Sequence, residues 1–103
     1  MAQIIWTEPA LGQLDDIAEY IALENPRAAA DLVKRVFNTV ERLVEHPESG
    51  PHPPELPTSI YREIVASPCR VFYRLEAVRA YIVYVMREEQ DLKRYMLSHN
   101  DDS

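Results

Sequence analysis

Hydrophobic residues in the first half of the chain recur at intervals of three and four positions, which is typical of amphipathic helices. Thr7 before Glu8-Pro9 indicates a helix start, because threonine caps a first turn and proline lacks only an N–H that is not bonded there. Asn25-Pro26 ends this helix and begins a second one over residues 27–46, so a helical hairpin is predicted. The apolar positions are Leu11, Leu14, Ile17, Ala18 and Ile21, then Ala29, Leu32, Val33, Val36, Phe37, Val40, Leu43 and Val44.

Side chains in the second half of the chain alternate between the two faces of short strands, which are predicted at residues 61–66, 69–75 and 80–87. A further short strand is predicted near the start of the chain, at residues 3–6. In the second of these, Cys69, Val71, Tyr73 and Leu75 form an apolar face that should point into the core. The opposite face carries Arg70, Phe72 and Arg74, which we expect to be open. Guanidinium groups suit planar contacts to carboxylates, phosphates or bases, so this face is predicted to bind a partner.

The last strand is apolar on both sides, since Tyr81, Val83 and Val85 alternate with Ile82, Tyr84 and Met86. This pattern favours a central strand. Short connections predict an antiparallel meander, and the proline-rich residues 47–57 predict a crossing loop. Residues 88–97 can form a short C-terminal helix, and residues 100–103 should fray. The predicted fold class is α+β with the order β-α-α-β-β-β, a helical hairpin packed on an antiparallel sheet.

A chain of 103 residues predicts a single domain, residues 1–103. Cys69 is the only cysteine, which excludes an internal disulfide and suits the reducing cytoplasm. No apolar run is long enough to cross a membrane. The histidines at 46, 52 and 99 lack ligand spacing, so neither a metal site nor a cofactor is predicted.

The net charge of −6 hides an uneven distribution. Residues 1–60 hold four basic and ten acidic side chains, whereas residues 61–87 hold five arginines and two glutamates. Four of these arginines should cluster on or beside one sheet face as a target-binding surface: Arg62, Arg70, Arg74 and Arg87. Salt bridges to the acidic helices are the alternative for each of them. No general acid or base is apparent near them, so catalytic residues are not assigned and binding is favoured over cleavage.

Several segments together resemble toxins of the RelE/ParE superfamily. They are Ile5-Trp6-Thr7, Ile17-Ala18-Glu19-Tyr20-Ile21-Ala22, Asn25-Pro26-Arg27-Ala28-Ala29, His46-Pro47-Glu48-Ser49-Gly50, Pro54-Glu55-Leu56, Tyr61-Arg62-Glu63 and Cys69-Arg70-Val71-Phe72-Tyr73-Arg74. The resemblance implies a growth-inhibiting toxin of a type II toxin–antitoxin module of the kind that stabilizes plasmids. It also implies a cognate antitoxin that wraps the toxin in a hetero-oligomer.

Relatives of the two types act differently. ParE-like toxins inhibit DNA gyrase, and RelE-like toxins cut mRNA in the ribosome. The long hairpin and the lack of a histidine in or next to the last strand resemble ParE, so gyrase inhibition is the expected activity. Pro51-His52 and the acidic Glu88-Glu89 depart from the family pattern. Ribosome-dependent cleavage and a non-toxic interaction domain therefore remain as alternatives.

Two structural expectations follow. A sheet with helices on one side leaves part of its other face open, and an antitoxin strand or helix would cover the apolar residues there. Phe37, on the stripe of the second helix, should be buried against sheet residues such as Val71 and Val83.

Overall fold

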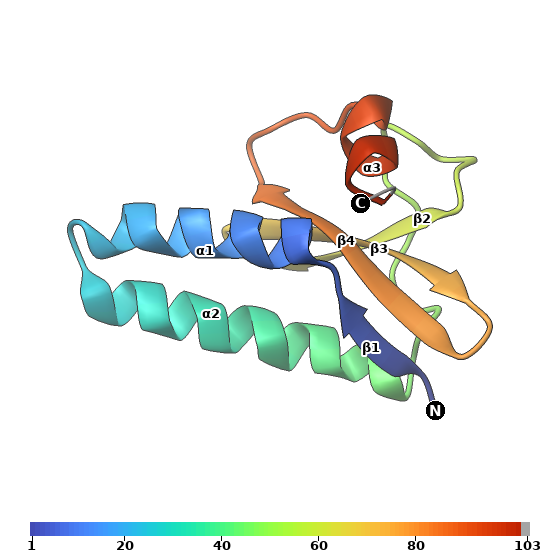
Figure 1. Ribbon diagram of the computed structural model, residues 1–103, viewed down its shortest axis with the longest axis horizontal. Helices are drawn as coiled ribbons and strands as arrows, with labels where there is room; N and C mark the ends of the chain where they lie inside the picture. The colour runs from blue at the N-terminus through green and yellow to red at the C-terminus, as the bar shows by residue number, and fades with distance from the viewer. Residues whose placement is uncertain (102–103) are drawn as a thin grey trace.

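The computed structural model in Figure 1 describes residues 1–101, with side chains to residue 98. A short strand precedes the helical hairpin, three strands follow it, and a helix ends the described chain. The elements are β1 (Gln3–Trp6), α1 (Glu8–Ala22), α2 (Pro26–Glu41), a 3-10 turn η1 (Arg42–Val44), β2 (Tyr61–Ala66), β3 (Cys69–Glu76), β4 (Arg79–Arg87) and α3 (Arg94–Asp101). None of the described helices is long and apolar enough to span a membrane.

Both helices of the hairpin begin with the capping residues that the sequence predicts. Thr7 Oγ1 accepts a hydrogen bond from the Ala10 N–H at 3.4 Å, and Asn25 Oδ1 accepts one from the Ala28 N–H at 3.1 Å. Each helix also has a proline in its first turn, where no backbone bond is lost. The two helices run side by side in opposite directions (Figure 1), which confirms the hairpin.

The sheet has the order β1-β4-β3-β2, so β4 is a central strand as its two apolar faces predict. β2, β3 and β4 form the predicted antiparallel meander. β1 pairs with β4 in parallel, which makes the complete sheet mixed. The α+β class and the order of elements are confirmed.

The hairpin covers one face of the sheet and forms the larger core with it. Leu32, Val36 and Val40 of α2 are almost fully buried there together with Val71 and Tyr73 of β3. The predicted inward face of β3 is therefore confirmed.

The expectation that the other face of β3 lies open is wrong. Phe72 on that face is fully buried, in a second cluster that includes Leu56 of the crossing loop and Leu92 and Leu97 near the C-terminus. A register shift between Phe72 and Tyr73 gives β4 one more residue than β3 at this point. It breaks the predicted alternation, because Val83 and Tyr84 both join the second cluster while Val85 joins the first.

Three further expectations need correction. The C-terminal helix begins at Arg94 instead of residue 88, since residues 88–93 form a turn and an extended segment. Asn100 and Asp101 belong to this helix, where fraying was expected, and residues 102 and 103 lie outside the described part of the chain. Phe37 is 39% exposed, with its ring centroid 4.9 Å from that of Trp6, so it packs outside the main core.

Candidate functional site

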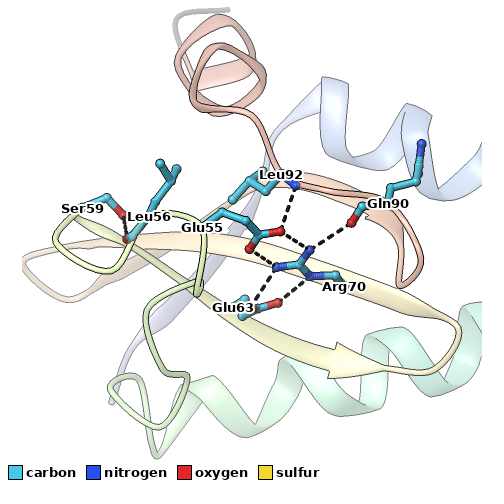
Figure 2. Close-up of polar contacts among 7 residues, drawn as sticks. All are labelled: Glu55, Leu56, Ser59, Glu63, Arg70, Gln90 and Leu92. Atoms are coloured by element: carbon cyan, nitrogen blue, oxygen red, sulfur yellow. Dashed lines mark hydrogen bonds and ion pairs between the residues drawn. The ribbon is translucent and has the colours of Figure 1, made fainter.

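Arg70 lies at the centre of a polar network between the sheet and the loops that cover it (Figure 2). β3 directs its side chain to the face that α3 covers. The guanidinium contacts Glu63 twice, with Nε to Oε2 at 2.9 Å and Nη2 to Oε1 at 3.1 Å. It also contacts Glu55 twice, with Nη1 to Oε2 at 2.8 Å and Nη2 to Oε1 at 2.7 Å. The Gln90 carbonyl accepts a further bond from Nη1 at 3.1 Å.

The network is buried, which strengthens its electrostatics. Arg70 is 8% exposed and Glu63 is 7% exposed. The hydrogen bond from Arg70 lowers the pKa of Glu55 from 4.5 to about 2, against a smaller opposing effect of burial. The hydrogen bonds from Glu55 and Glu63 raise the pKa of Arg70 above its usual value, so it stays protonated.

Glu55 also connects the network to the segment before the C-terminal helix. Its Oε2 accepts the backbone N–H of Leu92 at 2.9 Å, which joins the crossing loop to the segment before α3. Arg70 therefore fastens two loops onto the sheet. The sequence pattern could have indicated Glu63, which shares a face with Arg70 in adjacent strands, but it carried no signal for Glu55, fifteen positions away in a loop.

Arg74 lies on the same sheet face as Arg70 but nearer to solvent. Its Cζ is 4.3 Å from the ring centroid of Tyr81, and its Nη1 is 2.8 Å from Glu76 Oε2. The Arg74 side chain is 20% exposed and that of Glu76 is 67% exposed. This pair is of the exposed kind that contributes little to stability.

Arg62 lies on the opposite, hairpin-facing side of the sheet, opposite Tyr73 in the register. Its Nη1 donates to the carbonyls of Glu48 at 3.1 Å and Gly50 at 2.8 Å. The Tyr73 hydroxyl accepts the Gly50 N–H at 3.0 Å and donates to the Pro47 carbonyl at 2.8 Å. Only glycine fits here, because a Cβ at Gly50 would lie 2.6 Å from that hydroxyl. Arg62 thus anchors the loop after η1.

Arg87 lies opposite Cys69, at the other end of the β3–β4 strand pair from Arg74. It is on the side of the sheet that faces the helices α1 and α2. Its Nε donates to Glu89 Oε1 at 2.9 Å. It borders a cleft of about 360 Å³ at the turn between α1 and α2. Two strongly exposed apolar side chains line the same cleft, Tyr20 at 70% and Leu23 at 81%.

The structure therefore brings together only two of the four predicted target-binding residues. Arg70 and Arg74 share one face, whereas Arg62 and Arg87 lie on the other, so the expectation of a single patch is wrong. Residues directly opposite each other in neighbouring strands point to the same face of the sheet. Arg62 and Arg87 lie opposite core-facing residues of β3, so they point to the core-facing side. Among the side chains that the structure describes, no group of three or more His, Cys, Asp or Glu could hold a metal ion.

Comparison with known proteins places this fold in a class of bacterial toxins. The family described as ParE toxin of type II toxin-antitoxin system, parDE, matches residues 4–92. The chain belongs to this family.

Individual relatives agree with this assignment. Toxin RelE2 of Caulobacter vibrioides (strain ATCC 19089 / CIP 103742 / CB 15) is 38% identical over 68 residues, which cover 66% of this chain and 73% of that toxin. A protein of Sinorhizobium fredii (strain NBRC 101917 / NGR234) is 46% identical over 48 residues, or 47% of this chain and 50% of its own length. A solved chain described as the chromosomal ParDE TA system from P. aeruginosa has a TM-score of 0.72 over 86% of this chain and 98% of its own, at 23% identity. That likeness supports the fold.

Proposed function

We propose that this type II toxin inhibits DNA gyrase by binding it, without catalysing bond cleavage. It acts in the cytoplasm and is neutralised by a cognate antitoxin in a hetero-oligomer. Membership of the ParE family favours gyrase as the target.

The ion pairs of Arg70 are the observation that favours binding over cleavage. Cleavage of RNA through the 2′-hydroxyl needs a cation that stabilises the phosphorane, beside a general acid and a general base. Arg70 is the arginine of the family-like segment Cys69-Arg70-Val71, and two carboxylates already neutralise it. Contact with a phosphate would require breaking a buried ion pair, which favours a structural role for Arg70.

A second candidate is ribosome-dependent mRNA cleavage. It is favoured by the 38% identity over 66% of this chain to a toxin named RelE2. Under this alternative the network around Arg70 would open on the ribosome and release the guanidinium.

The two functions differ in what induction of the toxin should do to a cell. Gyrase inhibition predicts DNA damage signalling, loss of negative supercoiling in purified gyrase assays, and intact mRNA. Codon-positioned cuts in translated mRNA with unimpaired supercoiling would overturn the proposal in favour of cleavage. A chain that is harmless on induction and fails both assays would leave only an interaction domain. A copy with an early stop codon is the control for expression.

The antitoxin is tested separately. Co-expression with the adjacent reading frame should yield a complex that is stable in gel filtration and restores growth. Failure of every neighbouring protein to co-purify or to restore growth would contradict this part of the proposal.

A further inference from the structure

The turn between α1 and α2 projects beyond the ends of the strands and forms a tip (Figure 1). Two large apolar side chains lie on this tip and belong to neither hydrophobic cluster of the fold. Tyr20 is 70% exposed and Leu23 is 81% exposed, whereas the buried residues of α1 include Leu14 and Ala18. Exposed apolar side chains that gather at one place mark an interaction site.

Both side chains line a cleft of about 360 Å³, together with Glu24, Asn25 and Arg87. The Arg87 side chain is 35% exposed, and that of its ion-pair partner Glu89 is 66% exposed. An exposed pair of this kind contributes little to stability, so the guanidinium can exchange Glu89 for a group of a binding partner. The tip therefore combines an aromatic ring, an aliphatic side chain and an arginine. Aromatic residues and arginine are enriched at the centres of protein interfaces.

The charge of α1 indicates which partner the tip meets. The helix carries four acidic side chains and no basic one. Three of the four, Asp15, Asp16 and Glu19, follow one another within two turns and are exposed. An enzyme that holds DNA presents a basic surface to the phosphates. The acidic helix complements such a surface, and its field would steer the tip toward it.

We propose that this hairpin tip is the surface that binds DNA gyrase. The inference rests on the proposed function, because it assigns the surface for that target. Tyr20 and Leu23 enter an apolar pocket of gyrase, Arg87 donates hydrogen bonds to oxygen atoms at its rim, and α1 faces the basic surface nearby. A projecting tip fits a hollow in a large enzyme, whereas an antitoxin segment that wraps the toxin needs a groove along which to lie.

The apolar contact is tested with two substitutions and two matched controls. Tyr20→Gln and Leu23→Gln should each raise the toxin concentration for half-inhibition of supercoiling by roughly tenfold or more. Tyr95→Gln and Val78→Gln replace side chains that are 69% and 65% exposed elsewhere on the surface, and both should inhibit like the wild type. All four positions are mostly exposed, so the variants should keep nearly wild-type melting temperatures. Unchanged inhibition by both tip variants would overturn the proposal.

The charge contact is tested by surface plasmon resonance on immobilised gyrase. Asp16→Lys should slow association and make the association rate less sensitive to salt. Glu45→Lys makes the same change of net charge at an exposed position at the other end of the hairpin. This matched control should keep the rate within about threefold of the wild type. Equal effects of the two substitutions would overturn the role of the α1 face.

These outcomes separate the two proposals. If the wild type neither binds gyrase nor inhibits supercoiling, the proposed function fails and this inference fails with it. If the wild type inhibits and the tip variants inhibit equally well, only the assignment of the tip fails.

Two other occupants of the tip are tested with the same variants. A loss of antitoxin affinity with unchanged gyrase inhibition would show that the antitoxin covers the tip. A dimer of the isolated toxin that Tyr20→Gln abolishes, again with unchanged inhibition, would show that a second copy covers it. Either result overturns the inference.

Discussion

The Arg70 guanidinium and the Glu63 carboxylate form a two-point ion pair that crosses the β2–β3 ladder diagonally. Arg70 lies opposite Val65 in the register, and Glu63 lies opposite Phe72. Both residues are more than nine-tenths buried. Charges that have lost their water depend on each other, so removing one partner costs far more than the pair contributes relative to an apolar replacement.

We predict that Arg70→Met destabilises the fold by about 3–5 kcal/mol, because it leaves the Glu55 and Glu63 carboxylates together without a cation. A domain of this size has roughly 5–15 kcal/mol of stability in total. Urea unfolding followed by circular dichroism measures the loss. Arg74→Met is the matched control, and its exposed pair should cost about 1 kcal/mol or less.

The cause of the loss can be checked with a triple variant. Arg70→Met combined with Glu63→Leu and Glu55→Gln removes all three charges and keeps an acceptor for the Leu92 N–H. It should recover more than half of the lost stability. If the triple variant is as unstable as Arg70→Met alone, the stranded carboxylates are not the cause.

The network also predicts a dependence of stability on pH. The pKa of Glu55 is about 2 in the folded chain and 4.5 as the ordinary value. A carboxyl group whose pKa is lower in the folded than in the unfolded chain stabilises the fold at pH values above its unfolded pKa. This contribution is lost as the pH falls toward the pKa in the folded chain. The stability of the wild type should therefore fall between about pH 4.5 and pH 2, in excess of the fall shown by Glu55→Gln. A constant difference between the two proteins from pH 6 to pH 2.5 would contradict the contribution of Glu55.

The sequence predicts those features that depend on short-range periodicity. Thr7, Asn25 and the apolar stripes define the hairpin, and the two apolar faces of β4 place it in the middle of the sheet. The partners of Arg70 could not be predicted in the same way, because Glu55 reaches it from a loop whose path no periodic pattern describes. Leu92, Tyr95 and Met96 lie at helical spacing and predict a helix over residues 88–97, but the backbone of Gln90 and Leu92 bonds to the network instead.

Phe37 illustrates the limit of a helical stripe. It lies at the edge of the apolar stripe of α2 and packs on Trp6 at the rim, whereas Leu32 lies at the centre and is 1% exposed. We predict that Phe37→Ala costs about 1–2 kcal/mol, since it loses a rim contact without opening an enclosed cavity. Leu32→Ala should cost about 2–5 kcal/mol. Parallel thermal unfolding of the two variants decides this, and a larger loss for Phe37→Ala would place that ring in the core after all.

Toxicity should depend on Arg87 more than on Arg74, because the two arginines lie at opposite ends and on opposite faces of the β3–β4 hairpin. One compact target surface cannot include both. Arg87 adjoins a cleft with the exposed Tyr20 and Leu23, and aromatic and arginine side chains beside a hollow are typical of residues that dominate binding energy. We predict that Arg87→Glu abolishes growth inhibition on induction while Arg74→Glu retains it. Both substitutions change exposed or partly exposed ion pairs, so both variants should fold with nearly wild-type melting temperatures. Growth curves after induction, with soluble toxin measured in each culture, make the comparison. Loss of toxicity in Arg74→Glu alone would move the target surface to the α3-facing side of the sheet.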